Sequence, residues 1–175
     1  DICVSLISEH HSSLVPLKQI VEAKGAKLEI LDLTNDFDFP LAEFENLLKT
    51  QKVKVLSVAH VSNVLGTEFD IKKVCELAHK YNCLVLVDGS QAVGHKKLSG
   101  HKMLGPMGIG VLYAKAELLQ NMEPLFYGGG MIQKVMTDEV TFKNSVEKME
   151  AGTPNVEGAF ALATAIDYLQ KLGLE

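Results

Sequence analysis

Two residues whose side chains could take part in a reaction, Asp88 and Lys102, lie in neighbouring motifs of this sequence. Asp88 directly follows the apolar run Leu84–Val87 and precedes a glycine. This pattern indicates a buried parallel strand that ends at the carboxyl edge of a sheet. Ligands of open α/β sheets bind outside that edge. Lys102 lies between small residues and the Gly/Pro-rich turn Gly105–Gly108.

A buried carboxylate near a loop lysine suits one cofactor in particular, pyridoxal phosphate. This cofactor binds lysine as a Schiff base and needs an acidic partner on its pyridine nitrogen. Each residue also has a simpler interpretation. Asp-Gly is a common turn pair, so Asp88 could be only a turn residue. Most lysines are solvated surface residues, so Lys102 alone would carry little weight.

Four motifs together resemble the class V aminotransferase family, and within it the cysteine desulfurases of the SufS-like branch. They occur in the family's order and the similarity runs along nearly the whole chain. Any one of them alone would be weak. The motifs are His60-Val-Ser-Asn-Val-Leu-Gly-Thr67, Asp88-Gly-Ser-Gln91, Ser99-Gly-His-Lys102 and Glu150-Ala-Gly-Thr-Pro-Asn155.

The resemblance implies a role for each matching residue. Lys102 would form the Schiff base, and Asp88 would hold a proton on the ring nitrogen through its opposite charge. Ser99 and His101 would donate hydrogen bonds to the phosphate. Asn63 and Gln91 would hydrogen-bond the phenolic oxygen of the cofactor, although an isolated amide is usually a loop or cap residue.

Two further matches extend the expected site. His10 would stack on the pyridine ring and carry a proton, a role that imidazole suits near neutral pH. The adjacent His11 is a competing choice. Thr153 would reach the phosphate of the other subunit's cofactor, which implies a homodimer. A turn that caps the next helix would explain the Thr153 segment equally well.

The chain alternates strand and helix patterns, which predicts an α/β fold with a mostly parallel sheet flanked by helices. This agrees with the large domain of fold-type-I pyridoxal phosphate enzymes. The expected strands are Ile2–Ser8, Leu28–Leu33, Val53–Ala59, Cys83–Val87 and Ile109–Tyr113. The expected helices are Leu14–Lys24, Leu41–Lys49, Asp70–Tyr81, Lys115–Asn121 and Val156–Leu172, with serines capping the first, a turn or hairpin over Pro124–Ile132 and an uncertain extended stretch over Thr137–Val146.

Composition excludes several classes of function. The chain has 175 residues and a net charge of −5, and it lacks the basic cluster of a nucleic-acid-binding protein. No apolar run is long enough to span a bilayer, and the first residues do not form a signal peptide. Cys3, Cys75 and Cys83 fall on strands or inward helix faces, which predicts buried free thiols in a reducing, cytoplasmic compartment.

The sequence departs from the family pattern in three places. We expect residues 1–175 to be part of a cofactor-binding large domain, without the small domain. The mobile loop with the nucleophilic cysteine and the carboxylate-binding arginine are absent, as is the N-terminal phosphate loop. Only ten residues separate Asp88 from Ser99. A parallel crossover needs about a dozen residues, plus about five for the strand. Either a strand is deleted or a stretch is missing from the sequence, and the second is favoured because deletion would misplace Lys102.

The function that the resemblance implies is conversion of L-cysteine to L-alanine with an enzyme-bound persulfide. The persulfide would supply a sulfur-acceptor protein in iron–sulfur cluster assembly. Two alternatives stay open. One is a selenocysteine lyase or another class V pyridoxal phosphate lyase or aminotransferase. The other is a non-catalytic fragment of such an enzyme, which the short connection before Ser99 favours.

Overall fold

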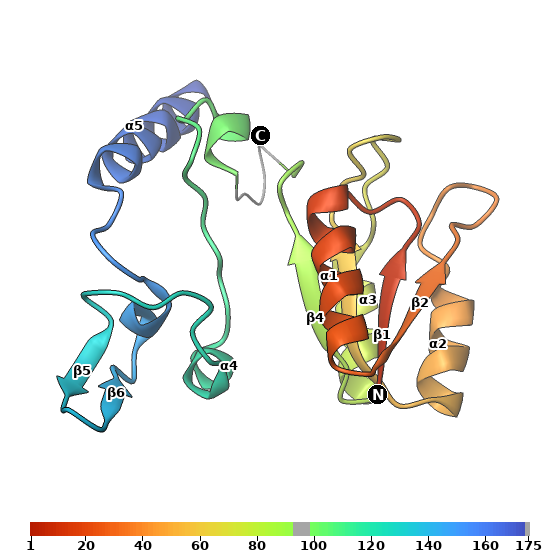
Figure 1. Cartoon of the computed structure of the whole chain (residues 1–175). Coiled ribbons are helices and arrows are strands. Elements are labelled where there is room, and N and C mark those ends of the chain that lie inside the picture. The colour runs from red at the N-terminus through yellow and green to blue at the C-terminus, as the bar shows by residue number, and fades with distance from the viewer. Residues whose placement is uncertain (93–98, 174–175) are drawn as a thin grey trace.

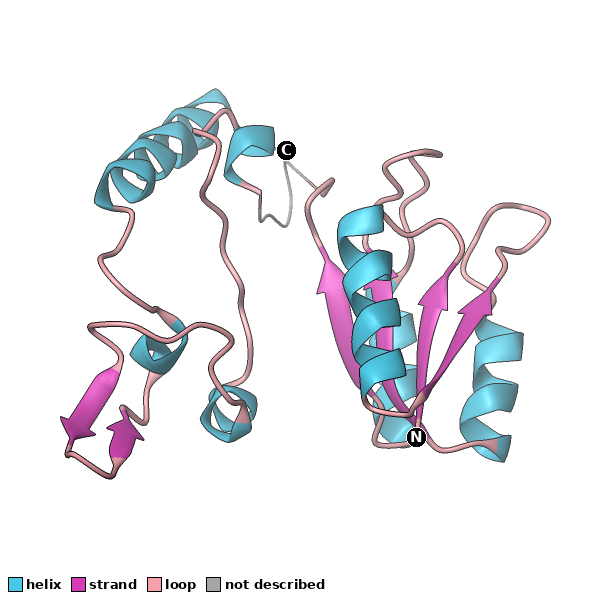
Figure 2. Ribbon diagram, in the orientation of Figure 1, coloured by secondary structure: helices cyan, strands magenta, loops and turns pink. Residues whose placement is uncertain are grey.

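The first part of the chain forms a parallel α/β layer (Figures 1 and 2). The structure is a computed structural model that describes residues 1–92 and 99–173. The sheet has the strand order β2-β1-β3-β4, and all three strand pairs are parallel, as predicted. In chain order the elements are β1 (Ile2–Leu6), α1 (His11–Ala23), β2 (Lys27–Leu31), α2 (Leu41–Thr50), β3 (Val53–Ala59), α3 (Ile71–Lys80) and β4 (Leu84–Asp88).

The strand order places a topological switch point between β1 and β3. From β1 the chain moves to β2 on one side, and from β3 it moves to β4 on the other side. The register aligns Ser5 with Ser57 and Ala59 with Asp88, so the carboxyl ends of three strands lie at one edge. In open α/β sheets this crevice is where ligands bind. The loops after β1, β3 and β4 are therefore placed to form a site.

The hydrophobic core lies on the face of the sheet that α2 and α3 cover. These two helices contact each other. Phe39, Phe44 and Phe69 form the centre of the core, with ring centroids 5.5 Å apart for Phe39 and Phe44 and 6.3 Å apart for Phe39 and Phe69. Both pairs are edge-to-face, the geometry that the ring quadrupole favours. Phe44 lies on α2 and is fully buried.

Helix α1 begins earlier than the sequence predicts. The expected cap was a serine before Leu14, but the helix starts at His11 and His10 is its N-cap. The Nδ1 atom of His10 accepts a hydrogen bond from the backbone N–H of Ser12 at 3.1 Å. The prediction was wrong because an imidazole nitrogen satisfies the first free N–H here, a role usually taken by a hydroxyl or carboxylate.

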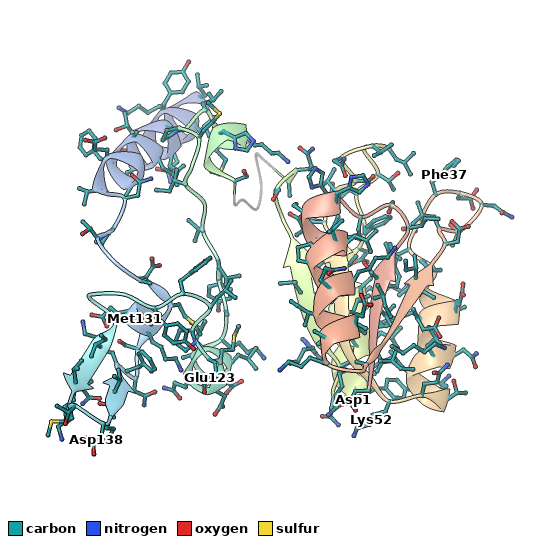
Figure 3. All side chains as sticks on the ribbon, in the orientation of Figure 1. Asp1, Phe37, Lys52, Glu123, Met131 and Asp138 are labelled. Carbon is teal, nitrogen blue, oxygen red and sulfur yellow. The ribbon has the colours of Figure 1, made fainter. Side chains whose placement is uncertain are left out.

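The second part of the chain has a 3-10 helix (Gly100–Met103), α4 (Ala116–Asn121) and an antiparallel hairpin of β5 (Ile132–Val135) and β6 (Val140–Phe142). A 3-10 helix (Val146–Met149) and α5 (Val156–Leu172) complete it. Met131, labelled in Figure 3, is fully buried beside the hairpin. The bounds of α5 are as predicted, and the uncertain extended stretch after Thr137 contains β6.

The predicted strand Ile109–Tyr113 is wrong. Among the described residues it makes one isolated bridge, between Ser99 and Gly110. Leu112 and Tyr113 are exposed. β-Propensity reflects packing against a neighbouring strand, and this segment has no continuous strand beside it in the described structure. The short connection between Asp88 and Ser99 lies largely outside the described residues.

An exposed ion pair joins the residues that precede β1 and β3, at the edge of the sheet opposite the carboxyl ends of the strands. The Nζ atom of Lys52 lies 3.2 Å from the Oδ1 atom of Asp1, and both residues are labelled in Figure 3. No described helix combines the length and the apolar character needed to cross a membrane.

We predict that Phe44→Ala lowers the free energy of unfolding by about 3–5 kcal/mol, because it leaves a cavity under the sheet. Denaturant unfolding followed by circular dichroism measures this change. The matched control is Phe160→Ala, since Phe160 is 76% exposed on α5. A loss of similar size in both variants would contradict the proposed position of the core.

Candidate functional site

A cavity of about 320 Å³ lies at the carboxyl edge of the sheet. Its volume is in the range of small-molecule sites. It collects every predicted site residue except Thr153, from two distant parts of the chain. The predicted residues that line it are His10, Asn63, Asp88, Gln91, Ser99, His101 and Lys102. The sequence analysis missed its other four lining residues, which are Ser12, Ala59, Val61 and Ser90.

Asp88 faces the cavity from the end of β4. Its Oδ1 atom accepts a hydrogen bond from the N–H of Ser90 at 2.8 Å. Its backbone oxygen accepts from the N–H of His60 at 2.9 Å, which continues the pairing with β3. The turn interpretation of Asp88 is thus correct locally. The same carboxylate still lines the cavity, and the turn fixes its position there.

The two adjacent histidines differ in position. His10 lines the cavity, and its Nδ1 atom is 2.7 Å from the Oγ atom of Ser12. His11 is exposed and is not among the residues that line the cavity. The two ring centroids are 6.4 Å apart. The cap on α1 explains this difference, because it holds the imidazole of His10 at the start of the helix.

Asn63 reaches the cavity from a short ordered loop after β3. Val61 and Glu68 form an isolated bridge that closes the loop. Inside it, the Oγ atom of Ser62 accepts hydrogen bonds from the N–H groups of Val64 and Leu65 at 3.3 and 3.2 Å. These contacts give an exposed amide a defined backbone position.

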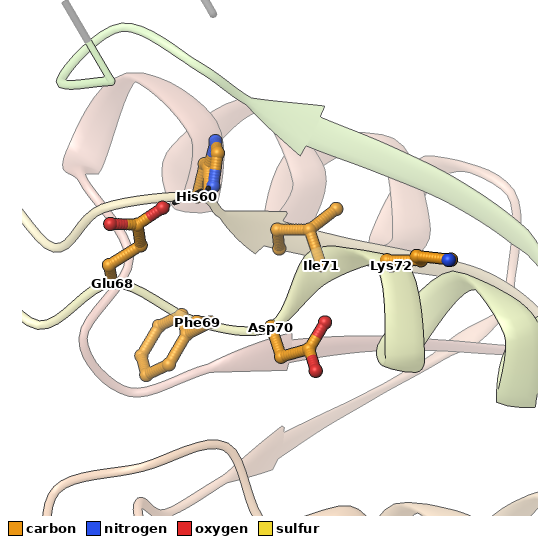
Figure 4. A pocket seen from close by; sticks show the side chains of 6 residues that line it. All are labelled: His60, Glu68, Phe69, Asp70, Ile71 and Lys72. Carbon is orange, nitrogen blue, oxygen red and sulfur yellow. Dashed lines mark ion pairs between the residues drawn. The ribbon is translucent and has the colours of Figure 1, made fainter. Parts of the chain in front are cut away.

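A second cavity, of about 380 Å³, is lined by residues from both ends of this loop and from the start of α3 (Figure 4). His60 and Glu68 form an ion pair in it, with 3.2 Å between Nε2 and Oε1. Its remaining lining residues are Phe69, Asp70, Ile71 and Lys72. None of the predicted site residues lines it. We therefore place the candidate site in the first cavity, where an amine, a carboxylate, amides, hydroxyls and imidazoles meet.

The segment that carries Lys102 requires glycine at position 100. The N–H of Gly100 donates to the backbone oxygen of Ile109 at 3.0 Å. A Cβ atom on Gly100 would lie 2.8 Å from that same oxygen and 2.8 Å from the Cγ2 atom of Ile109. The backbones of Gly100 and Ile109 are too close together to leave room for a side chain at position 100. This tight turn places Ser99, whose Oγ atom is 3.2 Å from the Nδ1 atom of His101, next to Lys102.

Helix α5 supports this segment from behind. The Oδ1 atom of Asn155 caps α5 by accepting from the N–H of Gly158 at 2.9 Å, and its Nδ2 atom donates to the backbone oxygen of Gly108 at 3.4 Å. The predicted capping role of this motif is therefore confirmed. Thr153, in the same motif, is exposed and lies outside the cavity.

Glu9 is a buried carboxyl group that the sequence analysis missed. The residue is 5% exposed, and its Oε1 atom accepts a hydrogen bond from the N–H of Ala59 at 2.8 Å. Burial raises the pKa of Glu9 to about 7 from its ordinary value of 4.5, and the negative charge of Asp88 adds to this rise. The hydrogen bond from Ala59 opposes it. No local sequence signal pairs Glu9 with a residue fifty positions away.

The three cysteines lie outside the cavity. All three are free thiols, but only Cys83 is buried as predicted, whereas Cys3 and Cys75 are partly exposed. Burial raises the pKa of Cys3 and Cys75, and it raises the pKa of Cys83 to about 11. Because the thiolate is the nucleophilic form, none of them is suited to attack a substrate.

The aminotransferase class-V family model matches residues 1–175. The chain belongs to the aminotransferase class-V family. Two curated relatives are called probable cysteine desulfurases. One, from Halalkalibacterium halodurans, is 41% identical over 95% of this chain and 44% of its own length. The other, from Vibrio cholerae, is 42% identical over 94% of this chain and 44% of its own length. The expected resemblance is confirmed.

Solved structures agree with the fold expected for the family. The cysteine desulfurase CsdA from Escherichia coli superposes with a TM-score of 0.92 at 33% identity, over 99% of this chain and 46% of its own. An apo cysteine desulfurase from Thermococcus onnurineus gives a TM-score of 0.90 at 34% identity, over 99% and 46%. The fold is thus that of the fold-type-I enzymes' large domain.

This family member spans less than half the length of those relatives. The match to a probable cysteine desulfurase of Synechocystis takes in 100% of this chain and extends over 187 residues. Since the chain has 175 residues, the relative carries 12 more within the matched region (187 against 175).

We predict that Glu9→Gln changes the pH dependence of stability. A raised carboxyl pKa means that the folded protein keeps a proton that the unfolded chain loses, so Glu9 costs stability increasingly as pH rises from about 4.5 to about 7. The variant removes this cost. Its free energy of unfolding should gain about 2–3 kcal/mol on the unaltered protein between pH 5 and pH 8. Denaturant titrations at several pH values measure the free energy of unfolding of both proteins. If the difference between them stays the same at every pH, the raised pKa of Glu9 is contradicted.

We predict that Gly100→Ala perturbs the Lys102 segment, because the added Cβ atom meets backbone rather than a flexible side chain. Overpacking of this kind costs about 1–3 kcal/mol of unfolding free energy. Gly129→Ala is the matched control, since no atom lies within 4 Å of a Cβ atom built there. Thermal unfolding compares the two variants, and equal midpoints would contradict the close approach at Gly100.

Proposed function

We propose that residues 1–175 are the cofactor-binding part of a pyridoxal phosphate-dependent cysteine desulfurase. The reaction converts L-cysteine to L-alanine and passes the sulfur to an enzyme thiol as a persulfide. The observation that supports this most strongly is the single cavity that seven of the predicted residues line, with Lys102 and Asp88 among them. Similarity to proteins called cysteine desulfurases supports the choice of reaction.

The chemistry of the cavity fits pyridoxal phosphate. An aldehyde needs an amine, which Lys102 supplies, and a pyridine nitrogen needs an acid, which Asp88 supplies. A phosphate needs several hydrogen-bond donors, and the tight turn at Gly100 sets Ser99 and His101 side by side for this purpose. When bound, the cofactor withdraws electrons from the amino acid and weakens bonds at its α- and β-carbons.

The residues that line the cavity from the sheet would hold or carry protons and would orient the ring of the cofactor. The carboxylate of Asp88 holds a proton at the ring nitrogen, because opposite charges favour each other at close range. His10 would contact the ring and would act as a proton carrier. The amide groups of Asn63 and Gln91 orient the phenolic oxygen. All four residues come from the loops after β1, β3 and β4.

Lys102 acts twice in this scheme. Its amine would hold the cofactor, and once substrate had replaced it the same amine would move a proton at the carbon atoms of the amino acid. The backbone N–H of Lys102 donates to the oxygen of Ser99 at 3.0 Å, which holds the backbone of Lys102 in the tight turn beside the cavity.

The sulfur step requires a thiolate that attacks the substrate sulfur. The carbon–sulfur bond of cysteine breaks, a sulfur–sulfur bond forms, and the β-carbon takes a proton to become the methyl group of alanine. Cys3, Cys75 and Cys83 lie outside the cavity with raised pKa values. We therefore assign the attack to a cysteine outside these 175 residues.

The same proposal includes the oligomeric state of the enzyme, its compartment and its partner protein. It works as a cytoplasmic homodimer in which Thr153 reaches the phosphate bound by the other subunit. The exposed position of Thr153, outside its own subunit's cavity, supports this role. The persulfide passes to a sulfur-acceptor protein that serves iron–sulfur cluster assembly.

We predict that the purified chain gains a visible absorbance band with pyridoxal phosphate that resists dialysis, and that Lys102→Ala abolishes it. After borohydride reduction, mass spectrometry should find the cofactor attached to the peptide that contains Lys102. Alanine and sulfide release from L-cysteine then measures the activity of a chain that includes the acceptor cysteine.

Lys134→Ala is the matched control, because Lys134 is an exposed lysine on β5. It should keep the band and the labelled peptide. Labelling of another lysine, or an equal band in Lys102→Ala, would overturn the assignment. A folded protein without any band would show that these residues alone do not bind the cofactor.

A further inference from the structure

Glu9 is the least explained charged group near the cavity. Among the described residues it is the only buried acidic one, and its Oε2 atom has no hydrogen-bond partner there. Burying a carboxyl group with one oxygen unpaired is costly. A glutamine or an apolar residue would avoid most of this cost, so the carboxyl group calls for a functional explanation.

The position of Glu9 links three parts of the cavity wall. It directly precedes His10, which lines the cavity and caps α1. Its Oε1 atom holds the N–H of Ala59, the last residue of β3, which also lines the cavity. Ala59 is paired in register with Asp88. One carboxyl group thus connects the loop of His10 to the backbone beside Asp88.

Glu9 lies near Asp88, because Ala59, whose N–H it binds, is the register partner of Asp88. Burial is the main cause of the raised pKa of Glu9, and the negative charge of Asp88 adds to it. The other titratable groups here are His10 on the same loop and His60 after Ala59. The ring of His60 is paired with Glu68 in the second cavity (Figure 4). Glu9 is therefore the second acidic group behind the cavity, in addition to Asp88.

We propose that Glu9 is a positioning residue of the cofactor site, which fixes His10 against the end of β3 and strengthens the hold of Asp88 on a protonated ring. The second part rests on the proposed function, because it requires a ring nitrogen opposite Asp88. A positive ring favours ionised Glu9, and two carboxylates together hold the ring proton better than one. The first part depends only on the described contacts.

Two variants separate these effects. Glu9→Gln keeps an oxygen that can accept from Ala59 but removes the charge, whereas Glu9→Ala removes both. Glu22→Ala is the matched control, since Glu22 is an exposed glutamate on α1. The first measurement is amide hydrogen exchange of the protein without cofactor. The second is the dissociation constant of pyridoxal phosphate and the pH midpoint of its visible band.

In Glu9→Ala we expect the Ala59 amide to exchange at least tenfold faster, while the core amide of Val74 on α3 changes little. We also expect at least tenfold weaker cofactor binding. Glu9→Gln should restore slow exchange at Ala59 but move the pH midpoint of the band lower by about half a unit to one unit. A merely structural role would leave that midpoint unchanged.

Unchanged exchange at Ala59 in Glu9→Ala would overturn the positioning role. An unchanged midpoint in Glu9→Gln, with cofactor bound, would overturn the action through Asp88. If the unaltered protein binds no pyridoxal phosphate, the proposed function fails, and the exchange result alone decides whether Glu9 positions the loop. The two failures are therefore distinguishable.

Discussion

The parallel pairing of β1 with β3 and of β3 with β4 is the constraint on which the candidate site depends. Parallel strands point their carboxyl ends the same way, so three loops open at one edge of the sheet. The switch in chain direction between β1 and β3 separates the following helices and leaves a crevice. Asp88, Asn63 and His10 meet there, although they are far apart in the sequence.

The sequence predicted much of this fold because the pattern of each element is strong. The bounds of β3 and α5 agree with the structure to the residue. The buried positions of Phe44 and Val74 follow from helical periodicity on one face. The site was predicted through four motifs, whose residues the cavity brings together. The residue at the carboxyl end of a strand can be predicted from the local sequence, because it is the residue at which an apolar run stops.

The features that the sequence did not predict depend on distant partners. The segment Ile109–Tyr113 has strand-forming residues, but a strand also needs a neighbour, and sequence composition does not supply one. The cap on α1 depended on an imidazole in an unusual role. Glu9 looked like an ordinary loop residue next to two histidines. Only its contact with Ala59, and the burial that goes with it, distinguishes it.

The cavity is lined by two stretches of chain, and this has a consequence for thermodynamic linkage. His10, Asn63 and Asp88 come from the sheet, whereas Ser99, His101 and Lys102 come from the segment held by α5. A ligand that touches both stretches binds only when they are correctly apposed. Its binding free energy is thus added to the stability of that arrangement, by about 2.7 kcal/mol when free ligand is a hundredfold above its dissociation constant. A bound ligand therefore stabilises the arrangement of the two stretches, and the thermal unfolding midpoint of the protein rises with the fraction of cavities that are occupied.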